Sequence, residues 1–161
     1  MSFKVKFQMR DKRFIAEHRG GLLKKDHHRQ LINWACICCE HVLPLISETV
    51  DERLINAILV AKAWASGNAK TGEAMKASVG CHAVARELAD PISIAVARSV
   101  GQAVATAHMA DHSLGAALYA LKAVKFANRS IDAERNWQNE QLPSDIRKLV
   151  LSTRTEKEHS F

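Results

Sequence analysis

The stretch DPISIAVARSVGQAVATAHMADHSLGAALYALKAV, residues 90–124, predicts two consecutive helices that are rich in small residues. Asp90 followed by Pro91 is a helix-start signal, because aspartate caps free backbone N–H groups and proline fits the first helical position. We expect this helix to run to about Met109 and the next to begin near Ser113. Alanine favours helices and lets their axes approach closely, so the pattern favours tightly packed helices.

Similar signals predict further helices on both sides of this stretch. Asp26 and Asp51 are expected N-caps, and Gly67 stands where a C-terminal glycine belongs. The expected ranges of these helices are residues 26–43, 51–67, 71–89, 132–141 and 144–152. The last nine residues, TRTEKEHSF, are expected to be frayed. The predicted fold class is all-α: a compact bundle of about five to seven antiparallel, alanine-rich helices with a basic N-terminal arm.

Positive charge is concentrated at the N-terminus of the 161-residue chain. Residues 1–29 contain nine of the 23 Lys/Arg residues and three Asp/Glu. The difference of six positive charges equals the net charge of the whole chain, +6. A basic arm can contact nucleic acid or an acidic partner, or it can be a solvated tail. We expect one helical domain, with the arm over residues 1–25, the helical core over 26–128, and C-terminal helices and a frayed tail over 129–161.

Within the arm, apolar residues alternate weakly at Phe3, Val5, Phe7 and Met9, which favours a short strand or an extended segment. A turn or hinge is expected at the Gly-Gly pair, residues 20–21. The sequence has no apolar run of about 18 residues, and its first residues lack the core of a signal peptide. We therefore expect a cytoplasmic protein with reduced cysteines and no membrane partner.

The stretch WACICCEH, residues 34–41, contains three of the four cysteines. On a helical wheel, Cys36 and Cys39 fall on a continuous apolar face, whereas Cys38 lies at its edge, towards Trp34 and His41. Free cysteine behaves as a small buried hydrophobe, so the favoured interpretation is core packing. Cys36 and Cys39 are expected to be buried, reduced and unliganded, and Cys38 is the one thiol worth testing for reactivity.

Two other interpretations of these cysteines stay open. Cys36 and Cys39 could supply two ligands of a zinc site if tertiary packing brought His108 and His112 to them. Cys38 could act as a nucleophile beside the histidine of the same stretch, although the sequence shows no group to orient that histidine.

A second set of polar side chains lies within otherwise apolar helices: His82, Arg86, Arg98, Gln102, His108, Asp111 and His112. Because buried polar groups need partners, the favoured interpretation is a structural network, and the alternative is a metal or acid–base site. His108 and His112 have the spacing of a zinc-protease helix, but Met109 stands where the glutamate should follow. This pair is also placed where a helix break would separate it. The sequence shows no phosphate-binding glycine loop and no serine-nucleophile motif.

Five stretches together resemble a known family: RDKRFIAEHRGG, HRQLINWACICCEHVLPL, DERLINAILVAKAWASG, CHAVARELADP and ARSVGQAVATAHMADHSLGAALYALKAV. They are similar to the bacterial putative immunity protein family over roughly residues 10–128. The resemblance implies an all-helical, immunity-protein-like domain of polymorphic-toxin systems. It further implies stoichiometric binding of a cognate protein toxin, with no catalysis, no catalytic residues, no metal and no cofactor.

On this interpretation the arm and the exposed loops are the expected contact surface, through Arg10, Lys12, Arg13, His18, Arg19 and Trp64. Two alternatives are a small helical metal-binding protein or enzyme that uses the His/Asp/Arg cluster, and a nucleic-acid-associated protein that uses the basic arm. Nucleic acid is the less favoured partner. Alanine-rich helices could also pack across a homodimer.

Overall fold

The computed structural model describes residues 10–158, with side chains to residue 156. Within this part of the chain the α-helices are α1 Lys25–Val42, α2 Glu52–Ala65, α3 Thr71–Glu87, α4 Pro91–Ala105, α5 His112–Phe126, α6 Ile131–Glu140 and α7 Ser144–Glu158. Short 3-10 turns occur at η1 Lys12–Phe14, η2 Glu17–Arg19 and η3 Leu43–Leu45. No strand occurs in this range beyond one isolated bridge. The all-α prediction is confirmed, and the alternation over residues 3–9 lies outside the described residues.

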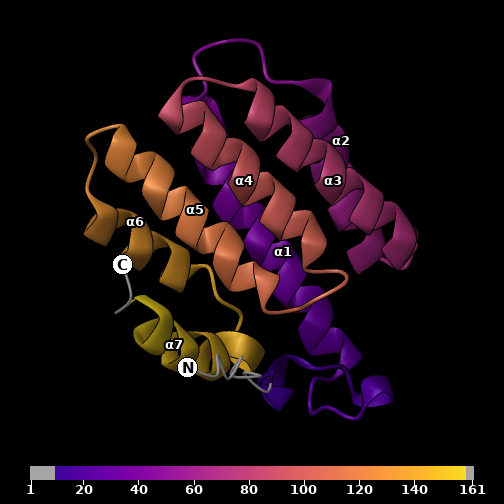
Figure 1. Cartoon of the computed structure of the whole chain (residues 1–161). Helices are drawn as coiled ribbons and strands as arrows, with labels where there is room; N and C mark the ends of the chain where they lie inside the picture. Colours follow the sequence, from indigo (N-terminus) through magenta and orange to yellow (C-terminus); the bar gives the residue numbers. More distant parts are fainter. Residues whose placement is uncertain (1–9, 159–161) are drawn as a thin grey trace, which may run out of the picture.

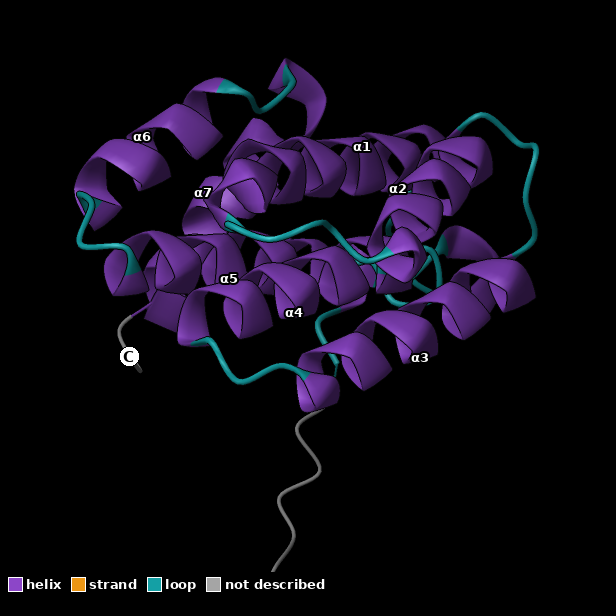
Figure 2. Ribbon diagram, turned by 90° about the horizontal axis from the view of Figure 1, so that it is seen from above, coloured by secondary structure: helices purple, strands orange, loops and turns teal. Residues whose placement is uncertain are grey.

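The first five helices form two layers (Figure 1). Figure 2 shows α3, α4 and α5 side by side in one layer and α1 with α2 in the other. Helix α1 packs against α2 in its own layer and against α4 and α5 across the interface, while α6 packs on α5 and α7 on α1. None of the helices in residues 10–158 is both long and apolar enough to cross a bilayer.

The predicted helix starts are largely confirmed. The Asp90 carboxylate accepts hydrogen bonds from the backbone N–H groups of Ile92 and Ser93, and Pro91 opens α4. Asp51 caps α2 in the same way. Gly67 follows α2 with φ +82°, a conformation that glycine adopts without strain. The prediction of Asp26 as an N-cap is wrong, because α1 begins one residue earlier and Asp26 lies in its first turn.

Helix α4 ends at Ala105, four residues before the expected end at Met109. The Thr106 hydroxyl donates to the carbonyl of Gln102 at 3.1 Å, and residues 106–111 then form a series of tight turns before α5. Neither glycine nor proline marks this ending in the sequence. His108 therefore lies in a turn and His112 opens α5, so the two histidines do not share a helix face.

Helix α7 continues to Glu158, so the prediction that residues 153–161 are frayed is wrong over its first part. Thr153 and Arg154 are buried. The Arg154 guanidinium donates to the side-chain oxygens of Gln138 at 2.7 Å and Asn139 at 2.9 Å. These contacts with α6 hold the last turns of α7 in place.

The cysteines are part of the hydrophobic core. Cys36 and Cys39 pack with α2, α3 and α4, which confirms the core-packing interpretation. Cys38 packs in a second cluster with Trp34 and α7 and is fully buried, so its predicted place at the edge of the apolar face does not make it accessible. Burial raises the pKa of Cys36 to about 12 and that of Cys38 further. All four cysteines are free thiols.

Candidate functional site

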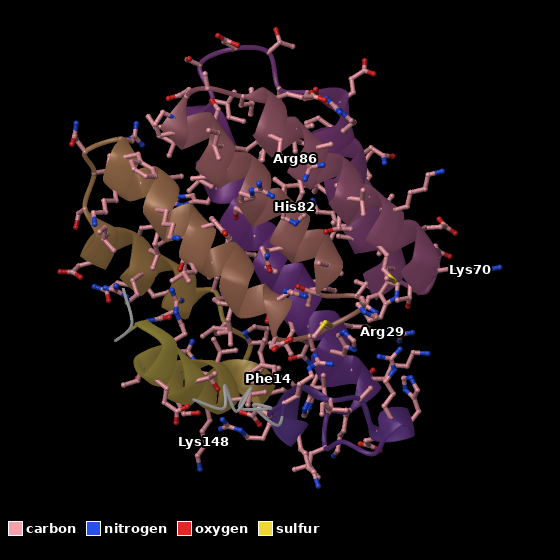
Figure 3. All side chains as sticks on the ribbon, in the orientation of Figure 1. Phe14, Arg29, Lys70, His82, Arg86 and Lys148 are labelled. Carbon is pink, nitrogen blue, oxygen red and sulfur yellow. The ribbon has the colours of Figure 1, made fainter. Side chains whose placement is uncertain are left out.

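Residues 10–24, called the N-terminal loop below, are folded against the helices. Phe14 and Leu23 are buried in the cluster that includes Trp34 and α7. Figure 3 labels Phe14 at the end of the molecule where the loop meets α7. The turn predicted at the glycine pair is present: Gly20 has φ +87°, and a Cβ on Gly21 would collide with the backbone of Ile15. The loop therefore requires glycine at residue 21.

Two arginines connect the N-terminal loop to the rest of the chain. The Arg13 guanidinium pairs with Asp11 at 2.6 Å and also reaches the hydroxyls of Ser152 and Thr153 in α7. Arg10 pairs with Asp111, in the turn between α4 and α5, at 3.3 Å. The first residues of the loop are thereby tied both to α7 and to the α4–α5 turn.

A pocket of about 310 Å³ lies between the N-terminal loop, the start of α1, the adjoining ends of α2 and α3, and the α4–α5 turn. It is called the loop pocket below. Its lining residues are Arg10, Phe14, Ile15, Ala16, Glu17, His18, Arg19, Leu23, Lys25, His28, Trp64, Thr71, Ala107, His108 and Ala110. Four of the predicted contact residues, Arg10, His18, Arg19 and Trp64, thus line one cavity. The two others, Lys12 and Arg13, lie on the same loop outside it.

Charged residues on the loop pocket are mostly basic. Arg10, Arg19 and Lys25 carry positive charge, against the single carboxylate of Glu17. The three cations belong to exposed residues. Their charge raises the potential at the pocket, which favours an anionic group there.

His28 and Trp64 join α1, α2 and the α4–α5 turn beside the loop pocket. The His28 Nε2–H donates to the carbonyl of Thr106 at 2.6 Å. The ring centroids of His28 and Trp64 are 4.7 Å apart. Trp64 Nε1–H donates to the Thr71 hydroxyl at 3.1 Å. Burial lowers the pKa of His28, and the nearby Arg19 and His18 add to this effect against the opposing Thr106 bond. His28 is therefore neutral at pH 7.

His108 brings a buried polar atom to this region. It lines the loop pocket, and its Nδ1 atom has no hydrogen-bond partner among the described residues. An unpaired buried polar atom is uncommon in proteins because its lost hydration is not replaced. His108 is thus separated from the polar cluster in which the sequence placed it.

Four other members of the predicted polar cluster form two pairs, while Asp111 pairs with Arg10 instead. Arg98 of α4 donates to Nδ1 of His82 of α3 at 2.6 Å, and Nδ1–H of His112 of α5 donates to the Gln102 side-chain oxygen at 2.7 Å. Burial, followed by the charges of Arg98 and Arg86, lowers the pKa of His82. Arg86 is exposed and lies one turn from His82 on α3 (Figure 3).

Two glycines, which the sequence interpretation missed, make room for these pairs. A Cβ on Gly101 would lie 2.9 Å from the His82 ring, and one on Gly115 would lie 2.7 Å from the Gln102 side-chain oxygen. No group of three His, Cys, Asp or Glu residues in the described part of the chain has an arrangement that could hold a metal ion. The His82–Arg98 and Gln102–His112 pairs are hydrogen bonds between neighbouring helices of one layer.

A profile of the Imm-5 like putative immunity protein family matches residues 21–145. The chain belongs to this family. No curated protein and no solved structure matches the chain. The matched segment of this Imm-5 like protein supplies Lys25, His28, Trp64 and His108 to the loop pocket, while Arg10, His18 and Arg19 lie before it. The pocket thus combines the family core with the preceding loop.

One further pair in the Imm-5 like protein was missed from the sequence. His41 Nδ1 lies 2.7 Å from a carboxylate oxygen of Glu134, and its ring stacks on Trp137 with centroids 3.5 Å apart. This contact joins the end of α1 to α6 across 93 positions in the chain. No local signal in either segment predicts it, because both lie on ordinary polar helix faces.

Proposed function

We propose that this protein is an immunity protein that inhibits a cognate protein toxin by one-to-one binding and performs no chemistry on it. The observation that carries the proposal is membership of the Imm-5 like family over residues 21–145, since the family name implies a toxin partner.

The proposed contact surface is the N-terminal loop together with the start of α1. Residues 10–29 contain seven Lys/Arg against three Asp/Glu. A surface of one sign steers an oppositely charged partner and accelerates association. We therefore propose that the toxin presents an acidic surface here. A bound immunity protein can block a toxin simply by covering its active surface, so no reactive group is needed.

The contacts that fix the conformation of the N-terminal loop also support the proposal that it forms the toxin-binding surface. Buried Phe14 and Leu23, the Arg13 contacts with α7 and the Arg10 pair with Asp111 hold the loop in one conformation before any partner binds. Preorganisation reduces the entropic cost of association. Trp64, partly buried beside the cations, is the kind of aromatic residue that often contributes strongly to protein–protein binding.

The proposal is tested by expressing the protein together with candidate toxins encoded by the genes beside its own. We expect protection of growth and a purified complex of one copy of each protein in light scattering. Arg19→Glu combined with Lys25→Glu should weaken the complex about tenfold or more, chiefly by slowing association. Lys125→Glu combined with Lys148→Glu is the matched control, because both lysines are exposed and lie outside the loop pocket. Absence of a complex, or a toxin that remains active in it, would refute the proposal.

A further inference from the structure

We infer that the loop pocket is an anchor site for one acidic residue of the protein partner, a glutamate or aspartate followed by an apolar residue. This inference rests on the proposed function, because it specifies the chemistry by which the toxin is recognised. It is argued from the size of the pocket, its charge, its apolar walls and its unpaired polar atom.

The size of the loop pocket suits a side chain or two rather than a whole helix or strand. Its volume of about 310 Å³ is at the lower end of the range for ligand pockets. Four separate segments surround it, from residue 10 in the loop to Ala110 in the α4–α5 turn. An occupant must therefore enter as a small protruding group.

The charges favour a carboxylate as that group. Arg10 and Arg19 approach from the N-terminal loop and Lys25 from α1, while Glu17 is the one acidic residue in the lining. A guanidinium can bind both oxygens of a carboxylate, which fixes the orientation of the anion as well as attracting it. Arg10 already pairs with Asp111 at 3.3 Å, so Arg19 and Lys25 are the cations better placed to respond to a ligand.

The inner walls are largely apolar and favour a carboxylate carried on a hydrocarbon body. Phe14, Ile15, Leu23, Ala107 and Ala110 contribute this surface. Apolar walls can cover the hydrocarbon part of an occupant, while the exposed cations meet its charge. A free inorganic anion could use the cations but would gain nothing from these walls. A glutamate stem, or an apolar residue beside an acidic one, would use both.

Two polar groups of the lining have hydrogen-bonding capacity that no contact within residues 10–158 uses. His108 Nδ1 is buried without a partner in the described residues. The Thr71 hydroxyl accepts the Trp64 Nε1–H bond and can still donate its own hydrogen. An occupant that carries both carboxylate oxygens and a backbone amide would satisfy such groups. Because Trp64 lines the pocket and bonds to Thr71, its indole N–H signal should change when an occupant binds.

The inference is tested by NMR titration of the intact protein with the peptide N-acetyl-glutamyl-phenylalanine amide. We expect a saturable shift of the Trp64 indole N–H signal. The glutamine analogue of the peptide should bind at least about tenfold more weakly, because it lacks the charge that the cations recognise. Trp64→Phe identifies the reporting signal. This test requires no toxin, so its result is independent of whether the protein inhibits one.

Arg19→Gln and Lys25→Gln should each weaken binding of the glutamate peptide severalfold, whereas Lys125→Gln should leave it unchanged. Both substitutions remove exposed charges without altering the buried residues, so a loss of binding would not reflect a loss of folding. Equal binding of the two peptides, shifts confined to other surfaces, or full binding by the Lys25→Gln variant would overturn the inference. Protection against the toxin would then still stand on its own test.

Discussion

A Cβ atom on Gly101 would lie 2.9 Å from Cε1 of His82 and 3.2 Å from Cβ of Cys81. This close approach of α3 to α4 also places the Arg98 guanidinium on His82. We predict that Gly101→Ala lowers the free energy of unfolding by about 1–3 kcal/mol, because overpacking outweighs the better helix propensity of alanine. Urea denaturation measures the difference.

Gly80→Ala in α3 is the control for this effect, since nothing lies within 4 Å of the added Cβ. It should raise the free energy of unfolding by about 0.5–1 kcal/mol. Replacing His82 by alanine in the Gly101→Ala background should recover part of the loss. A Gly101→Ala protein as stable as the Gly80→Ala protein would contradict the packing described for α3 and α4.

Stability should fall as the pH decreases from 7 to 5, while most carboxylates are still ionised. The pKa values of His28 and His82 are lowered in the folded protein, with burial as the main cause. The unfolded chain therefore binds more protons than the folded protein near pH 6. The two neutral histidines contribute fully to stability above the pKa of about 6.5 of an unfolded histidine, and this contribution is lost as the pH falls below that value. Arg19 and His18 face His28, and Arg98, Arg86 and His112 face His82, so protonation of either adds repulsion.

Thermal unfolding measured at several pH values tests this expectation. His28→Gln keeps an N–H donor for the Thr106 carbonyl but cannot titrate, so its midpoint should change less between pH 7 and 5 than that of the natural protein. An unchanged midpoint of the natural protein over this interval would show that these histidines are not held in their neutral forms.

The cysteines should not react with a thiol reagent in the folded protein. Cys36, Cys38 and Cys39 are fully or almost fully buried, and burial raises the pKa of each thiol, so the reactive thiolate is scarce. We expect almost no colour from Ellman's reagent at pH 8 and four equivalents after denaturation in urea. Rapid reaction of one native thiol would indicate an opening of the core that the structure does not contain.

Changing Gly21 to alanine should unfold the N-terminal loop while the helices stay folded. The added Cβ would overlap the backbone of Ile15, which cannot move without breaking the contacts between the two halves of the loop. We expect faster proteolysis within residues 10–24 and a changed Trp64 indole signal, with helical circular dichroism nearly unchanged. Gly72→Ala, which meets nothing within 4 Å, should leave the loop intact.

The parts of the fold that depend on local signals were predictable from the sequence. Asp51 and Asp90 act as caps through bonds to residues two or three positions away, so their effect is visible in the sequence itself. The end of α4 at Ala105 and the extension of α7 beyond residue 152 were not predictable. They depend on the α4–α5 turn and on contacts of Arg154 with α6, which require the tertiary structure.

The candidate site shows the same division. The sequence predicts a contact surface at the basic residues of the N-terminal loop from their charge alone, and this stays a prediction. Their convergence with Trp64 and His108 was not predictable, because residues 10, 64 and 108 meet only through the packing of α1 against α2 and α4. Conversely, His108 and Asp111 share a stretch with His112, yet Asp111 pairs with Arg10, His112 pairs with Gln102, and His108 Nδ1 has no partner among the described residues.

The central claim is that this Imm-5 like protein inhibits a toxin by stoichiometric binding through its basic loop. The most direct measurement is titration of toxin activity with the purified protein and with the Arg19→Glu, Lys25→Glu variant. We expect a linear loss of toxin activity that ends at one equivalent of the natural protein, and a weakened, curved titration for the variant. Complete inhibition by a small fraction of one equivalent, or the same titration for both proteins, would contradict it.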